Sequence, residues 1–391
     1  MLLIDLTHTS HTPANTGIQR LARSLCAALE RRTAVAPVCL DPFADAWRPL
    51  DALELRLARG EEPVGRHRGS RWTLGQKARG WTLRFLRKVP PLPAASGLVC
   101  PELFSPAVAV RFAELAANVA GPRIGFFFDA IPLTHPEYTP PKTVARFPGF
   151  MQELLQFDGV AAISQTSADY LSGYWSWLGV TKTPAVTVVP LGVDLPQTAP
   201  RTARPPATSA PQVLCVSSIE GRKNHLALLA AAESLWAAGV QFELRLVGLP
   251  RPETAAAALR EIERLRAAGR ALRFDGVLDE PALEQAWADC TFSVYPSMIE
   301  GFGLPVIESL VRGKPCVCAA TGATGELIPG GGCLGVTTPD ADGFAAALRR
   351  LLTEPELLPR LRAEGCARKI ATWDDSAAHL LSWMAELASR E

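Results

Sequence analysis

The chain has little that would place it in a membrane or send it out of the cell. It contains no run of about 18 apolar residues, the length that spans a bilayer as a helix. Its opening residues, MLLIDLTHTSHTPANTG, have only a short apolar part and no basic residues before it, which argues against a secretion signal. The sequence therefore predicts a cytoplasmic protein without a membrane-spanning helix.

Strong net charge and paired cysteines are also missing. Lysine and arginine total 40 against 39 for aspartate and glutamate, so no overall field favours nucleic acid as a partner. The nine cysteines are scattered and odd in number, which is typical of reduced thiols. Cys316 and Cys318 alternate in the apolar run PCVCA without histidines at ligand spacing, so we interpret them as strand packing and not as a metal site.

Two common nucleotide motifs are absent as well. No GxxxxGK[ST] pattern occurs, and no GxGxxG follows a predicted strand. These absences argue against the nucleotide hydrolases and dinucleotide enzymes that depend on such glycine loops.

What the chain does have is a repeated alternation of short apolar runs with helical patterns, which predicts an α/β protein with parallel sheets. A chain of 391 residues exceeds one ordinary core, and the proline-rich stretch 194–211 is typical of a linker. We therefore expect an N-terminal domain at 1–193 and a C-terminal domain at 212–372. The last helix, 373–391, can cap either domain, and we expect it on the N-terminal one. Ligands bind beyond the carboxyl ends of parallel strands, so two Rossmann-like, doubly wound domains should face a central cleft.

The stretch SMIEGFGLPVIESL, at 297–310, follows one of the predicted strands. Its glycines favour a loop, and its proline suits the first turn of a helix. Free N–H groups in such a loop and helix start suit anionic or hydroxyl-rich ligands. Glu300 should stand at the loop and Glu308 about one turn into the helix. The alternative is that Glu308 only complements the helix dipole and Glu300 is a solvated acid.

A second stretch, CVSSIEGRKNHLALL at 215–229, has the same strand, turn and helix pattern. It places Arg222 and Lys223 at the predicted helix start, where cations are unfavourable unless an anion pairs with them. A diphosphate would satisfy both side chains and the helix end. A solvated basic pair remains the alternative.

The motifs together resemble a known family. EGFGLPVIE resembles the E-x7-E signature of retaining glycosyltransferases with the GT-B fold, particularly glycosyltransferase family 4. VSSIEGRKNH resembles the phosphate-binding segment of that family, and FFFDAIPLTHPEYTPP, at 126–141, resembles a segment common in bacterial mannosyltransferases. The resemblance covers most of the chain from residue 15 onward. Its motifs are specific for the superfamily, but they give little information about which substrate is used.

This resemblance implies a metal-independent, retaining hexosyltransferase. The donor would be a nucleoside diphosphate sugar, with GDP-mannose favoured, and no other cofactor is implied. The acceptor would be a lipid-linked saccharide, in the assembly of bacterial surface polysaccharide such as lipopolysaccharide. Two alternatives remain open: a catalytically idle GT-B module that binds a saccharide or a partner, and a sugar-nucleotide epimerase.

The roles of the family's motif residues can be assigned to the matching positions of this sequence. The resemblance implies that Glu300 contacts the transferred sugar, that Glu308 holds the ribose, and that Lys223 with Arg222 neutralises the diphosphate. The other implied donor-binding positions are Gly301, Phe302, Gly303, Leu304, Ser218 and Gly17.

The chain also departs from the family pattern. Ser217 stands where some members have an arginine, and Phe128 stands where many have a histidine. The second departure puts in doubt which group reaches the donor from the N-terminal domain. Asp129, His135 and His11 are the candidates for the acceptor or for that side of the cleft, although each of them can equally be structural.

An insertion at 59–91 bears on the acceptor. From Arg66 to Lys88 it has no acid, many basic residues and several aromatics. In a helix, Leu74, Trp81 and Phe85 would share one face, which suits a surface lying on anionic lipid. That interpretation predicts a peripheral enzyme at the inner face of the cytoplasmic membrane. The alternative is a basic, solvated hairpin whose aromatics pack on the domain.

Overall fold

The computed structural model describes residues 1–61, 69–103, 105–193 and 210–389. The chain divides into two compact units, which are described separately. The first contains Met1–Ala130, Lys142–Gly192 and Ala371–Glu391, and the second contains Ile131–Pro141 and Val193–Ile370. Most of the expected linker, residues 194–209, lies outside the described residues. Within the described residues, no helix is long and apolar enough to cross a membrane.

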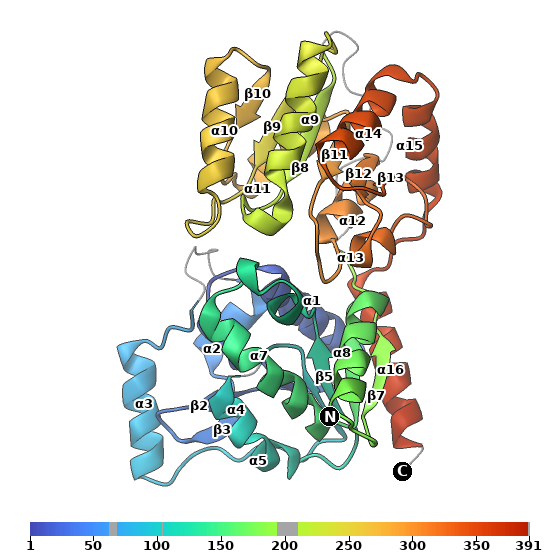
Figure 1. The fold of residues 1–391 in the computed structure, drawn as a ribbon. Coiled ribbons are helices and arrows are strands. Elements are labelled where there is room, and N and C mark those ends of the chain that lie inside the picture. Colours follow the sequence, from blue (N-terminus) through green and yellow to red (C-terminus); the bar gives the residue numbers. More distant parts are fainter. Residues whose placement is uncertain (62–68, 104, 194–209, 390–391) are drawn as a thin grey trace. The chain divides into compact units, whose positions relative to one another are not determined.

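The first unit is built on a seven-stranded sheet that is parallel except at one edge, where two strands pair antiparallel (Figure 1). From that edge the strands are β3 (Ala46–Pro49), β2 (Val35–Asp41), β1 (Leu2–Asp5), β4 (Gly97–Cys100), β5 (Arg123–Phe127), β6 (Gly159–Ala162) and β7 (Ala185–Val188). Strands β1, β4 and β6 are buried along their whole length, as the inner strands of a parallel sheet covered on both faces must be. The strand order reverses between β1 and β4.

Helices surround this sheet, and the last helix of the chain is one of them. It packs against the first helix, and the Arg31 guanidinium lies 2.8 Å from the Asp374 carboxylate between them. The helices of the first unit are α1 (Gly17–Glu30), α2 (Ala52–Arg59), α3 (Leu74–Phe85), α4 (Pro106–Val110), α5 (Phe112–Ala116), α7 (Pro141–Glu153), α8 (Gln165–Trp177) and α16 (Trp373–Ala388), with 3₁₀ turns η1 (Thr9–His11) and η3 (Leu154–Gln156).

The second unit has a six-stranded, fully parallel sheet. In spatial order its strands are β10 (Leu272–Phe274), β9 (Glu243–Val247), β8 (Gln212–Val216), β11 (Phe292–Tyr295), β12 (Cys316–Ala319) and β13 (Cys333–Val336). Counted from β8, this is the 3-2-1-4-5-6 order of a doubly wound, Rossmann-type sheet. The order reverses between β8 and β11, so the loops that follow these strands diverge there and leave room for a ligand.

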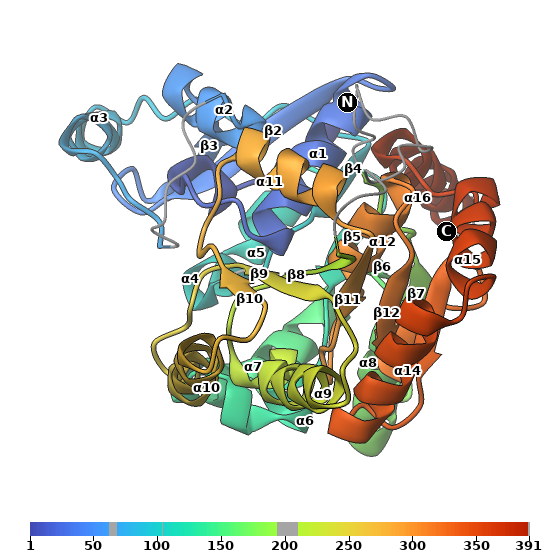
Figure 2. The same cartoon turned by 90° about the horizontal axis from the view of Figure 1, so that it is seen from above.

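Helices cover both faces of the second sheet. Seen from above, α10, α9 and α14 lie on one side of it, and α11 and α12 lie on the other (Figure 2). Cys316 and Cys318 are buried in β12 against α12, as the alternating pattern predicted. The helices and turns are α6 (Ile131–Thr134), η2 (Pro136–Tyr138), η4 (Gly221–Lys223), α9 (His225–Ala237), α10 (Ala256–Ala267), α11 (Glu280–Asp289), α12 (Leu304–Val311), α13 (Gly322–Gly325), α14 (Ala341–Thr353) and α15 (Leu357–Ala367).

Candidate active site

The segments after β8 and β11 meet at the point where the strand order of the second unit reverses. After β8 the chain forms the short 3₁₀ turn η4, which carries Arg222 and Lys223. Asn224 then takes a left-handed conformation, with φ of 57°, and α9 begins at His225. The two cations therefore lie directly before the helix, at the helix start that the sequence pattern predicted. Asn is one of the few non-glycine residues that adopts this backbone conformation readily.

Glu300, which follows β11, is the centre of a hydrogen-bonded cluster. Lys223 Nζ donates to one of its carboxylate oxygens, and Arg222 Nη1 lies 2.9 Å from the other. Tyr295 Oη donates to the same carboxylate at 2.8 Å and accepts from Lys223 Nζ at 2.6 Å. Ser297 Oγ also donates to it. The Glu300 side chain is only 11% exposed, so a single buried carboxylate joins both candidate phosphate-binding cations.

The electrostatics of the cluster follow from this pairing. Burial alone raises the pKa of Glu300, but Lys223 and Arg222 lower it to about 2, so the carboxylate is ionised at neutral pH. Burial lowers the pKa of Lys223, and Glu300 opposes that shift. Arg222 is also 2.9 Å from Glu220, whose carboxylate accepts from Ser218 Oγ at 3.1 Å. Two cations thus face two carboxylates, and Arg251 Nε also lies 3.7 Å from the second of these, Glu220.

The glycine loop and α12 continue from Glu300. Gly303, at the N-cap of α12, has φ of 109°, a conformation that a residue with a Cβ rarely adopts. Gly301 is buried, whereas Phe302 and Leu304 are half-buried and pack against the apolar cluster between α12 and β12. Glu308 is half-buried in α12, as the fifth residue of the helix. The structure therefore joins Glu300, Lys223 and Arg222 directly and places Glu308 further along the same loop–helix segment.

The remaining candidates are spread over both units. Gly17 is exposed as the first residue of α1, and a Cβ built there has nothing within 4 Å. Asp129 is half-buried just after β5 in the first unit. His135 belongs to the second unit, where its Nδ1 lies 3.0 Å from Thr134 Oγ1.

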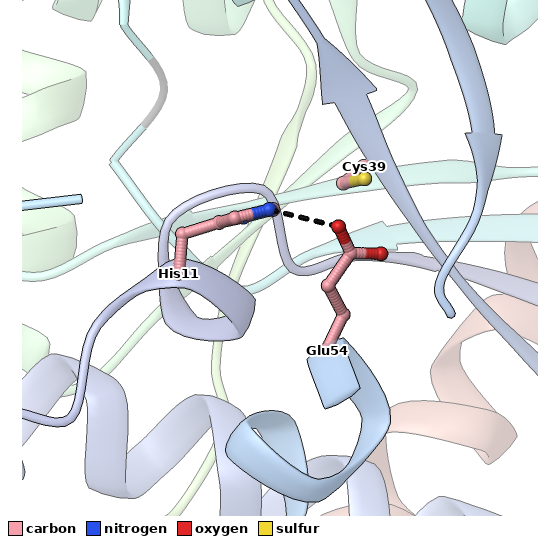
Figure 3. A group of neighbouring side chains, drawn as sticks. All are labelled: His11, Cys39 and Glu54. Atoms are coloured by element: carbon pink, nitrogen blue, oxygen red, sulfur yellow. Dashed lines mark hydrogen bonds and ion pairs between the residues drawn. The ribbon is translucent and has the colours of Figure 1, made fainter. Parts of the chain in front are cut away.

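His11 has protein partners on all sides. Its Nε2 lies 3.0 Å from Glu54 Oε1 (Figure 3). Its Nδ1 lies 2.9 Å from the carbonyl oxygen of Thr7. The ring stacks on Trp72 with centroids 3.7 Å apart, and the residue is 1% exposed. His11 therefore ties the loop after β1 to α2 and to the segment before α3.

The same corner holds a group of metal-ligand types. Donor atoms of His11, Cys39 and Glu54 lie within 4.8 Å of one another (Figure 3). Arg48, however, is 2.7 Å from Glu54 and 2.8 Å from Asp41, and burial raises the pKa of the Cys39 thiol well above its usual range. The carboxylate is already neutralised by a guanidinium, so we interpret the group as a buried ion-pair cluster.

Two buried acids hold the loop after β1. The sequence analysis did not identify either of them as a candidate. The Glu102 carboxylate accepts from the backbone N–H groups of His8, at 2.9 Å, and Thr9, at 2.7 Å. Asp5 accepts from the N–H and hydroxyl of Thr7. Burial, and secondarily Glu102, raises the pKa of Asp5 to about 7. The sequence signal that could have identified them is their position, because Asp5 ends the apolar run LLID and Glu102 lies two residues after the apolar run GLVC.

Helix α3 presents an exposed apolar face. Leu74 is 84% exposed, Trp81 60% and Phe85 87%. The opposite face is seated on the first unit, where a Cβ at Gly80 would be 2.6 Å from the Cβ of Phe43. Phe85 therefore points to solvent, whereas the Trp81 ring also lies edge-on to Phe43 with centroids 5.7 Å apart, so the alternative in which the aromatics pack on the domain holds in part.

Comparison with known proteins bears on the fold and on the second unit. Residues 210–354 match the family model described as Glycosyl transferases group 1. The solved structure of sucrose-phosphate synthase from Thermosynechococcus elongatus matches with a TM-score of 0.68 at 19% identity, covering 100% of this chain and 99% of that one. The chain has the GT-B fold, as predicted, and its second unit contains a Glycosyl transferases group 1 domain.

Two curated relatives are mannosyltransferases by name, which agrees with the resemblance found in the sequence. The MMP alpha-(1->4)-mannosyltransferase of Mycolicibacterium hassiacum is 31% identical over 199 residues, covering 50% of this chain and 47% of that protein. The GDP-mannose-dependent alpha-(1-6)-phosphatidylinositol dimannoside mannosyltransferase of Mycobacterium tuberculosis is 30% identical over 222 residues, covering 54% of each. The chain thus spans about half the length of these relatives.

Proposed function

We propose that the protein is a retaining glycosyltransferase that moves a hexose, with mannose favoured, from a nucleoside diphosphate sugar to a saccharide acceptor. The observation that carries the proposal is the meeting of Lys223, Arg222 and Glu300 at the strand-order reversal of the second sheet. A buried lysine beside a half-buried arginine suits a diphosphate, and a neighbouring carboxylate suits sugar hydroxyls. The names of the relatives support a mannosyl donor.

The proposed chemistry needs charge neutralisation more than acid catalysis. Transfer at an anomeric carbon passes through an oxocarbenium-like state, and the diphosphate leaves as an already stable anion. Lys223 and Arg222 would stabilise the charge that develops on that leaving group. Attack occurs on the same face, and a leaving phosphate oxygen accepts the proton of the acceptor. Glu300 then positions the sugar and is not a nucleophile.

A thermal-shift panel tests the donor. GDP-mannose, GDP, UDP-glucose, ADP-glucose and a dTDP sugar are each added to the full chain, and we expect GDP-mannose to raise Tm most. A ligand present at 100 times its Kd stabilises the native state by about 2.7 kcal/mol, which corresponds to a shift of several degrees. The absence of a shift with every sugar nucleotide would contradict the donor-binding proposal. Binding without donor hydrolysis or transfer would favour the catalytically idle module instead.

We further propose that the acceptor is lipid-linked and that α3 meets the membrane, in a role in bacterial surface polysaccharide assembly. The described residues 71–88 contain Arg71, Lys77, Arg79, Arg84, Arg87 and Lys88 and no acid. Each basic residue near an anionic bilayer contributes about 1 kcal/mol, and the exposed aromatics can enter the headgroup region. Arg79 also pairs with Asp51 and Arg84 with Asp45, which reduces the contribution of these two arginines to membrane binding.

Flotation with vesicles tests this surface. The protein should float with phosphatidylglycerol vesicles at low salt and not with phosphatidylcholine vesicles. The double variant Trp81→Ser, Phe85→Ser should lose flotation. The matched control is Trp177→Ser on α8, which removes another aromatic that is 79% exposed and should leave flotation unchanged. Equal behaviour of the two variants, or no binding of the unaltered protein at low salt, would refute membrane contact through α3.

A further inference from the structure

We propose that Glu300 is an internal counter-ion that occupies the phosphate-binding cations until a diphosphate displaces it. The inference rests on the proposed function and concerns the regulation of the same site. It assigns Glu300 a role before the sugar is bound, in addition to positioning the sugar afterwards.

The contacts of Glu300 carry the argument. Its two carboxylate oxygens are divided between the cations, with Lys223 on one and Arg222, at 2.9 Å, on the other. This is the way a phosphate group would use the same pair of side chains. Tyr295 and Ser297 donate further hydrogen bonds that hold the carboxylate in this position.

Burial limits the access of water to the ion pair between Lys223 and Glu300. The side chains of Lys223 and Glu300 are 8% and 11% exposed, so little water can screen or replace their charges. A diphosphate that approaches this cluster meets cations that already have partners, because Glu300 contacts both Lys223 and Arg222 and Glu220 contacts Arg222. It must therefore take Arg222 and Lys223 from Glu300 before it gains their full attraction.

An exchange of partners follows from this competition. When the diphosphate binds the cations, the Glu300 carboxylate loses its two cationic partners but keeps the hydrogen bonds from Tyr295 and Ser297. It then becomes available to hydroxyl groups of the attached sugar. When the diphosphate product is ready to leave, Glu300 can return to the cations and compensate for its loss. The carboxylate thus weakens the binding of the free diphosphate while it favours the complete donor.

Titration calorimetry with inorganic pyrophosphate tests the exchange, since this probe has neither base nor sugar. Glu300→Gln keeps the size of the side chain and removes its charge, so pyrophosphate should bind about tenfold more tightly than to the unaltered protein. Ser297→Ala keeps the charge and removes one hydrogen bond from the Glu300 carboxylate, so it should tighten binding by a smaller factor. It keeps the test valid if Glu300→Gln does not fold.

The matched control is Asp275→Asn. Asp275 is 10% exposed and pairs with Arg245 at 2.7 Å in the same unit, so its removal changes the net charge equally at another buried ion pair. Pyrophosphate affinity should not change in this variant. Equal or weaker binding to Glu300→Gln, equal tightening in Asp275→Asn, or no pyrophosphate binding by any of these proteins would each overturn the counter-ion role. The donor-binding proposal is tested separately, by the change in Tm that each sugar nucleotide causes.

Discussion

Sugar transfer by the Glu300→Gln variant is expected to be about 100-fold slower in kcat than transfer by the unaltered protein. The amide fills the same space but no longer offers a charged acceptor to the sugar hydroxyls. The anomeric carbon is then held less precisely, and displacements of about 1 Å cost about 100-fold in rate. Steady-state kinetics with saturating donor and acceptor measure the effect.

Donor binding should survive this substitution, because Arg222 and Lys223 remain. The appropriate control is again Asp275→Asn, because Asp275 pairs with Arg245 and Arg273, and the kcat of this variant should stay normal. Near-normal turnover by Glu300→Gln would show that Glu300 does not position the sugar.

Replacement of Lys223 by methionine is expected to raise the Kd for the free nucleoside diphosphate by about 10- to 100-fold. Hydrogen bonds to charged groups contribute about 1.5–3 kcal/mol, and a methionine retains the apolar stem without the ammonium. The free energy of unfolding should also fall, because Glu300 and the Tyr295 hydroxyl lose a buried partner. Calorimetric titration and chemical denaturation measure the two effects separately.

Lys314→Met provides the comparison for this loss of stability. Lys314 is 3% exposed, and its ammonium donates to the carbonyl oxygens of Ala288 at 2.9 Å and Cys290 at 2.6 Å. Its loss should destabilise the same unit without changing the affinity for nucleoside diphosphate. If Lys223→Met left that affinity intact as well, Lys223 would not bind the diphosphate.

Much of the fold was accessible from local patterns. The strand before SMIEGFG and the helix that begins around Pro305 are both present, because apolar runs, glycines and proline act within a few residues. Strands β2, β3, β4 and β10 were missed. A proline in the interior of VAPVCLD and the shortness of AWRP weaken the strand signal.

The sequence predicted the two segments of the site separately. It did not predict that Lys223 and Arg222 of one segment contact Glu300 of the other. Glu300 and Lys223 are 77 positions apart, and they meet only because β8 and β11 are neighbours at the reversal of strand order. Strand order depends on pairing that no local pattern records. Tyr295 ends the strand before the glycine loop and Ser297 follows two residues later, and the hydroxyl groups of both were overlooked. His11 was considered as a pocket residue, but its stacking on Trp72 depends on contacts over 61 positions that periodicity does not reveal.

The position of α16 has a consequence for the order in which the chain can fold during synthesis. Gly159 of β6 lies so close to Trp383 that a Cβ would be 2.6 Å from that ring, and Gly97 of β4 lies similarly against Met384. These core contacts of the first unit come from residues that leave the ribosome after all of the second unit. The unit that begins first therefore cannot complete its packing until the second has been made, which reverses the usual N-terminal-first sequence of domain folding.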